Sequence, residues 1–85
     1  MKNNNNESYN PRLKALILEV VDNQIRDNTP PITAITLKRL MDNGYSRQQA
    51  KEMIGSVVAG HIFYIMHDEK PFDEEAYTHD LLELK

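Results

Sequence analysis

Residues 46–66 constrain the fold of this chain more than any other segment. Apolar residues recur there every three or four positions, which is the spacing of a helix, and they cover two sides of it. One side, interrupted by a single histidine, holds Ala50, Met53, Ile54, Val57, Val58, His61, Ile62 and Ile65, and the other holds Gly55, Ala59, Phe63 and Met66. A helix that is apolar on two sides has to be covered by other elements. The segment therefore predicts a long inner helix in the middle of a bundle.

Local signals fix the start of this inner helix and suggest how its neighbours approach it. Ser46 is followed three residues later by Gln49, a capping box in which each side chain satisfies the backbone N–H of the other residue. Gly55 and Gly60 lie inside the predicted helix, where each glycine costs about 1 kcal/mol relative to alanine. We expect a packing reason for both, namely the close approach of a neighbouring backbone.

A first helix is predicted to begin at Asn10-Pro11. Asparagine caps helix N-termini well, and proline at the first helical position loses no hydrogen bond that the helix needs. Apolar residues at helical spacing follow as far as Ile25. Residues 27–31 end this helix, because the residue before a proline disfavours the helical region.

Two more helices complete the prediction. One begins near Thr29 or Thr33 and ends at Asn43-Gly44, with Ile35, Leu37, Leu40 and Met41 as its apolar residues. The other runs from an N-cap at Asp73 to about Leu84, with Ala76, Tyr77, Leu81 and Leu84 facing inward. No segment alternates with a period of two, so strands are not expected. The sequence predicts an all-α fold, a compact four-helix bundle with a long central third helix.

Length and composition set the limits of this fold. The chain has 85 residues, which suits one domain; we expect a single helical domain at 10–85. Residues 1–9 contain four consecutive Asn and almost nothing apolar, so we expect a disordered N-terminal tail. There is no Cys, which excludes disulfides and cysteine-based zinc sites or nucleophiles. Neither a signal peptide nor a membrane span is indicated, and we expect a cytoplasmic protein.

Gln24 and His61 are the candidate buried polar pair. His61 lies near the centre of the apolar stripe of the inner helix, and Gln24 is in register with the apolar residues of the first helix. Because an unpaired buried polar group costs about 1–3 kcal/mol, we expect the two side chains to meet. A satisfied hydrogen bond that fixes the register of the helices is favoured over a role in proton transfer or ligand binding.

Nucleic-acid binding is a weaker alternative. The segment 37–50 is similar to a helix-turn-helix motif, in which Lys38, Arg39, Arg47 and Lys51 would contact phosphates. The chain carries ten basic against thirteen acidic residues, a formal net charge of −3, and its acidic excess lies in residues 66–85. Such a balance disfavours a phosphate backbone as partner.

The chain resembles a small bacterial family of uncharacterised all-helical domains. The residues that carry the likeness are Asn10-Pro11, Asp22-Asn23-Gln24, Pro30-Pro31, Leu40, Gly44, Ile54-Gly55-Ser56-Val57, His61, Phe72-Asp73 and Tyr77. Many members of that family have Glu at the position of Asp22 and a His-Glu-x-x-His segment, whose two histidines are competent to hold a metal. Here Gln48, Gln49 and Glu52 stand in that segment. The resemblance leaves Asp22, Asn23 and Glu52 as a candidate functional remnant.

These observations favour a non-enzymatic function. We assign no catalytic residue, no metal ligand and no cofactor, and we expect a protein-interaction or self-associating module whose partner is another protein or a second copy. The alternative is a degenerate metal-binding protein or enzyme that uses His61 with Asp22 and Glu52. Glu52 lies nearly opposite His61 around the predicted helix, so one site does not easily include both.

Overall fold

The computed structural model of the protein describes residues 10–85, so the tail predicted for 1–9 lies outside the described residues. The all-α prediction is confirmed: the described part of the chain is 79% helical and contains no strands. The four helices are α1 (Pro11–Asp27), α2 (Pro31–Asp42), α3 (Arg47–Asp68) and α4 (Glu74–Leu82). The longest is α3, with 22 residues. Over residues 10–85, the structure has no helix with the length and hydrophobicity of a membrane span.

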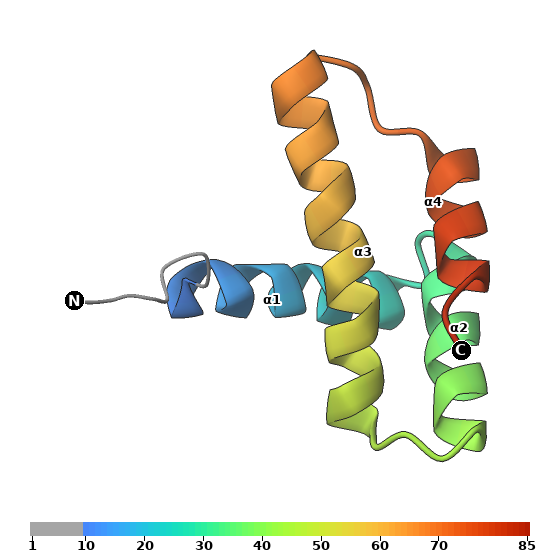
Figure 1. Cartoon of the computed structure of the whole chain (residues 1–85). Coiled ribbons are helices and arrows are strands. Elements are labelled where there is room, and N and C mark those ends of the chain that lie inside the picture. Colours follow the sequence, from blue (N-terminus) through green and yellow to red (C-terminus); the bar gives the residue numbers. More distant parts are fainter. Residues whose placement is uncertain (1–9) are drawn as a thin grey trace.

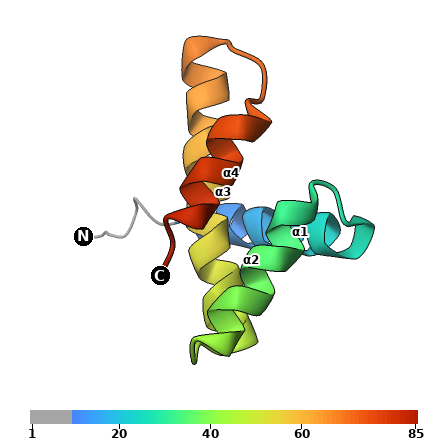
Figure 2. The same cartoon turned by 90° about the vertical axis from the view of Figure 1, so that its right-hand side faces the viewer.

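The long helix α3 touches each of the other three helices. In Figures 1 and 2 it stands upright, and α1 crosses it at a steep angle. Helix α2 lies beside the first half of α3, and α4 lies beside the second half, on the same side as α2 (Figure 1). The first half of α1 projects past α3 on the opposite side, away from α2 and α4 (Figure 1). The bundle is therefore built on the long helix α3, with α2 and α4 packed on one side of it and α1 crossing it.

The predicted caps are present at three of the four helix starts. Asn10 accepts hydrogen bonds from the backbone N–H groups of Arg12 and Leu13, at 2.9 and 3.2 Å. The capping box of α3 is complete, because the Ser46 N–H donates to Gln49 Oε1 and the Gln49 N–H donates to Ser46 Oγ. Asp73 accepts from the N–H of Ala76. Capping residues thus gave the starts of α1, α3 and α4 correctly.

The predicted start of α2 was wrong in its cap. Pro30 is the N-cap residue and no side chain caps the helix, so neither Thr29 nor Thr33 does so. The Thr29 hydroxyl donates instead to the backbone carbonyl of Asp27, at 3.1 Å. Thr33 lies one turn inside the helix, fully buried. Proline at the first helical position starts this helix without a side-chain cap, since it has no N–H to satisfy.

The core lies where the four helices meet. Its buried apolar residues are Val21, Leu37, Leu40, Ala50, Ile54, Val58, Tyr77 and Leu81. Two of the four apolar residues named for α2 stay outside this core: Ile35 is 60% exposed and Met41 41% exposed. Two threonines of α2, Thr33 and Thr36, are completely buried instead. The covered side of α2 is therefore less apolar than its composition suggests.

Burial along α3 is uneven. Ala50, Ile54, Gly55 and Val58 are buried, and all four lie in the first twelve residues of the helix. In the second half, Phe63 is 68% and Met66 74% exposed. The helix is central to the bundle as predicted, but the cover expected on both of its apolar sides is incomplete in this half, because α1 crosses α3 near Gly55 and no other helix of residues 10–85 covers the side of Phe63 and Met66.

The two glycines of α3 have different surroundings. A Cβ atom on Gly55 would lie 3.4 Å from Ile17 and 3.6 Å from Leu18 of α1, so this glycine marks the crossing point. A Cβ on Gly60 would meet nothing within 4 Å. The expected packing reason is therefore present at Gly55 and absent at Gly60.

This difference predicts opposite effects of substitution. Gly60→Ala should raise the free energy of unfolding by about 0.5–1 kcal/mol, since it removes the helix-interior penalty without a new contact. Gly55→Leu should lower it by about 1–3 kcal/mol, since the larger side chain forces α1 away from α3. Urea denaturation followed by circular dichroism measures both. A stabilised Gly55→Leu variant would contradict the described crossing.

Candidate functional site

A shared hydrogen-bond acceptor joins three helices. Gln24 of α1 accepts at Oε1 from the Thr33 hydroxyl of α2, at 2.7 Å, and from the Tyr77 hydroxyl of α4, at 2.8 Å. The Thr33 and Tyr77 oxygens are 3.4 Å apart. Both hydroxyl-bearing residues are almost completely buried. We call Gln24, Thr33 and Tyr77 the polar lock, because the three side chains fix three helices relative to one another.

The predicted Gln24–His61 pair is replaced by two separate contacts. Gln24 belongs to the polar lock, whereas His61 Nε2 lies 2.7 Å from Asp80 Oδ2 on α4. The Tyr77 ring packs edge-on against the imidazole of His61, with centroids 5.5 Å apart. Gln24 and His61 both line a small cavity of about 110 Å³, together with Phe72 and Tyr77. Both residues do face inward, but Tyr77 from α4 supplies the partner that Gln24 requires.

One signal of the polar lock is present in the sequence. Tyr77 was expected to face inward, and a buried tyrosine hydroxyl nearly always needs a hydrogen-bond partner. Thr33 was read as a helix cap rather than as a buried donor. Which side chains of α1 and α2 would meet this hydroxyl depends on where α4 docks, and helical periodicity does not specify that.

The polar lock predicts a ranking of variants. Gln24→Met removes the acceptor and leaves the buried hydroxyls of Thr33 and Tyr77 without it, so the free energy of unfolding should fall by about 2–3 kcal/mol. Tyr77→Phe removes one donor and leaves the Thr33–Gln24 bond intact, so the loss should be about 1 kcal/mol. Chemical denaturation measures both, with Tyr64→Phe as control because Tyr64 is 49% exposed. Equal losses for Gln24→Met and Tyr77→Phe would contradict the shared acceptor.

The His61–Asp80 pair connects α3 to α4. The His61 side chain is 15% exposed and the Asp80 side chain 50% exposed. The hydrogen bond from His61 lowers the pKa of the Asp80 carboxyl below its ordinary value; partial desolvation opposes this, and His79, 3.6 Å away, assists it. The pair lies beside a groove of about 510 Å³ between α3 and α4, whose walls include Tyr64, Ile65 and Asp73. The imidazole of His61 and the carboxylate of Asp80 thus bind each other at the side of this groove.

This pKa shift predicts a dependence of stability on pH. A carboxyl whose pKa is lower in the folded than in the unfolded chain stabilises the fold above its unfolded pKa of 3.8, and the contribution disappears as the pH falls through the folded pKa. Asp80→Asn should therefore show a shallower loss of stability than the wild type below about pH 4. Thermal unfolding at several pH values tests this, with Glu83→Gln as a control for an acidic residue on the same turn. Identical acid profiles for Asp80→Asn and the wild type would contradict the role assigned to the pair.

The candidate remnant residues Asp22, Asn23 and Glu52 do not converge on one site. Asp22 Oδ1 forms an ion pair with Lys51 Nζ at 2.7 Å, and Glu52 Oε2 lies 3.2 Å from Lys14 Nζ. Both ion pairs connect α1 to α3. Glu52 also accepts from the Gln48 amide at 3.0 Å, and these partners lower the pKa of its carboxyl.

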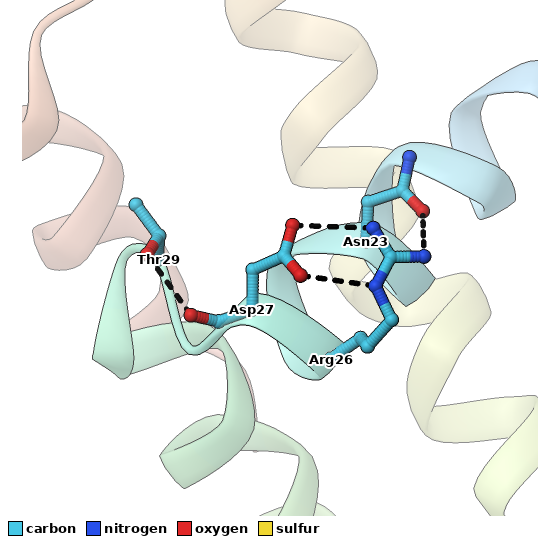
Figure 3. A network of polar contacts seen from close by, with 4 residues as sticks. All are labelled: Asn23, Arg26, Asp27 and Thr29. Atoms are coloured by element: carbon cyan, nitrogen blue, oxygen red, sulfur yellow. Dashed lines mark hydrogen bonds and ion pairs between the residues drawn. The ribbon is translucent and has the colours of Figure 1, made fainter.

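Asn23 belongs to a separate polar network at the end of α1 (Figure 3). The Arg26 guanidinium donates to Asn23 Oδ1 at 2.9 Å and to both carboxylate oxygens of Asp27, at 2.9 and 3.2 Å. The hydrogen bond between Arg26 and Asp27 raises the pKa of the Arg26 guanidinium and lowers the pKa of the Asp27 carboxyl. The Arg26–Asp27 pair is exposed, and an exposed pair of this kind contributes little to stability.

Residues 10–85 contain no cluster of three or more His, Asp or Glu side chains arranged to hold a metal ion. His61 is not brought together with Asp22 or Glu52: its partner is Asp80, and those two carboxylates pair with lysines. The ligand set of the metal-binding alternative is thus not assembled.

The basic residues of the nucleic-acid alternative are largely engaged within the protein. Lys38 pairs with Asp42 at 3.0 Å, and Lys51 pairs with Asp22. The Arg39 guanidinium donates to the backbone carbonyls of Leu84 and Leu81, at 2.7 and 2.9 Å. Arg39 therefore caps the C-terminal end of α4, a role that the sequence did not predict. Only Arg47, at the first position of α3, has no such contact in the described part of the chain.

An apolar corner forms where α1 crosses α3. A groove of about 400 Å³ lies there, and its lining includes Leu13 and Leu18 of α1 and Gly55 and Ala59 of α3. Beyond the groove, exposed apolar side chains continue along both helices. We call the residues Leu13, Leu16, Ala59, Phe63 and Met66 the α1–α3 notch. This surface follows from the two-sided apolar pattern of residues 46–66, but its position depends on where α1 crosses.

Comparison of the chain with models of protein families, with curated proteins and with solved structures found no match. The resemblance to the bacterial helical family stays a prediction.

Proposed function

We propose that this protein is a small, non-enzymatic interaction domain that binds another protein chain through the α1–α3 notch. The observation that carries the proposal is the exposure of large apolar side chains on both arms of the notch: Leu13 is 52%, Leu16 54%, Phe63 68% and Met66 74% exposed. Contiguous apolar surface of this kind on a soluble domain marks interaction sites. A cytoplasmic location is part of the proposal.

The contacts that the polar and charged groups make within the protein support a binding role rather than a catalytic one. Gln24 and the buried hydroxyls of Thr33 and Tyr77 bind one another in the polar lock, and His61 is held by Asp80. The carboxylates of Asp22 and Glu52 bind lysines across the α1–α3 contact. Each of these groups stabilises the packing of helices and so keeps the notch in shape. The notch itself has a single charged pair, Lys14 with Glu52, along its groove.

Site-specific photo-crosslinking in the producing cells tests the proposal. A photoreactive phenylalanine analogue replaces Phe63 in the notch, and in a matched control it replaces Ile35 of α2, which is 60% exposed and lies outside the notch. We expect a covalent protein adduct from position 63 and none from position 35. Absence of an adduct at position 63, in a variant that keeps its helical circular dichroism, would overturn the proposed function.

A further inference from the structure

We propose that the partner of the α1–α3 notch is a second copy of this chain, held in a two-fold symmetric dimer in which each notch receives the second half of the partner's α3. This inference rests on the proposed function and names its partner. Four observations carry it: the direction in which the apolar side chains point, the shape of the corner, the area that these side chains expose, and the charges at the ends of the two arms.

Both arms of the notch turn their apolar side chains into the same corner. On α3, Ala59 and Met66 follow Gly55 at four and eleven positions, so they share the side that meets α1 at Ile17. On α1, Leu13 lies seven positions before Val20, which faces the small cavity under the second half of α3 beside Ile62. The corner is thus lined from two directions.

The shape of the corner is self-complementary. From the crossing at Gly55, α3 continues for 13 residues to Asp68, about 20 Å of helix. This length projects beyond α1, and the first half of α1 projects beyond α3 (Figure 1). Two such corners close on each other around a two-fold axis, so that the α3 arm of each copy covers the α1 arm of its partner.

The exposed area matches what a small dimer requires. Taking roughly 150–250 Å² for a large side chain, the exposed parts of Leu13, Leu16, Phe63 and Met66 present about 450 Å² per copy. A standard interface buries about 800 Å² per partner, and about 65% of a homodimer interface is apolar, or roughly 500 Å². The four side chains therefore supply nearly all the apolar surface of such an interface.

The charges at the ends of the arms fit the same arrangement. When two corners close around a two-fold axis, the free end of α1 in one copy meets the free end of α3 in the other. Arg12 lies in the first turn of α1, and Glu69 caps the end of α3. Both residues are exposed. Opposite charges therefore face each other at both ends of the interface.

Sedimentation velocity of the full chain over a range of concentrations tests the inference. We expect a monomer–dimer equilibrium that Phe63→Glu shifts to monomer, while the control Ile35→Glu leaves it unchanged. Circular dichroism establishes that Phe63→Glu keeps its fold, which its 68% exposure allows. A wild type that stays monomeric, or a dimer that Phe63→Glu leaves intact, would overturn the inference.

A charge exchange gives an independent test of the arrangement. Glu69→Arg should weaken dimerisation about two- to thirtyfold, because the two-fold axis places one such exposed ion pair at each end of the interface, and adding Arg12→Glu should restore it. Failure of the double variant to recover dimerisation overturns the two-fold arrangement. If the purified chain is monomeric while position 63 still crosslinks to a different protein in cells, the second copy is excluded and the proposed function stands.

Discussion

One amide oxygen holds the relative positions of three helices. Gln24 Oε1 accepts from hydroxyls on α2 and α4, and the two residues that donate them, Thr33 and Tyr77, are almost completely buried. Apolar contacts alone tolerate sliding, because any close fit of similar volume serves nearly as well, whereas two directed bonds to one atom do not. The positions of α1, α2 and α4 relative to one another depend on this constraint.

Most of the helix starts could be predicted from the sequence because the capping residues that mark them are local. The capping box at Ser46, the Asn10-Pro11 start and the Asp73 cap each involve residues within three positions of each other, so no tertiary information was needed. Thr33 shows where local reasoning stops. Threonine is a good capping residue and also a good buried donor, and the packing of α1 and α4 against α2 decides between these roles.

The candidate site was harder to predict, since its residues come from different helices. Periodicity correctly placed Gln24 and His61 toward the interior, and their shared cavity reflects that. It did not reveal that the Tyr77 ring lies between the α1 and α3 side chains, nor that Asp80 would bind His61 from the edge of α4. The role of Arg39 was not predicted for the same reason, because its two carbonyl partners are more than forty residues away in the chain.

The uneven cover of α3 has a consequence for how the domain opens. Around Ile54 every turn is held by neighbours, so amide hydrogens there exchange with solvent only when the whole domain unfolds. The turns around Phe63 and Met66 have one exposed flank, and their amides exchange through small local openings at a much lower cost in free energy. The single continuous helix α3 thus contains two regions that open with different cooperativity. A partner that covers the region around Phe63 and Met66 makes that region open together with the region around Ile54.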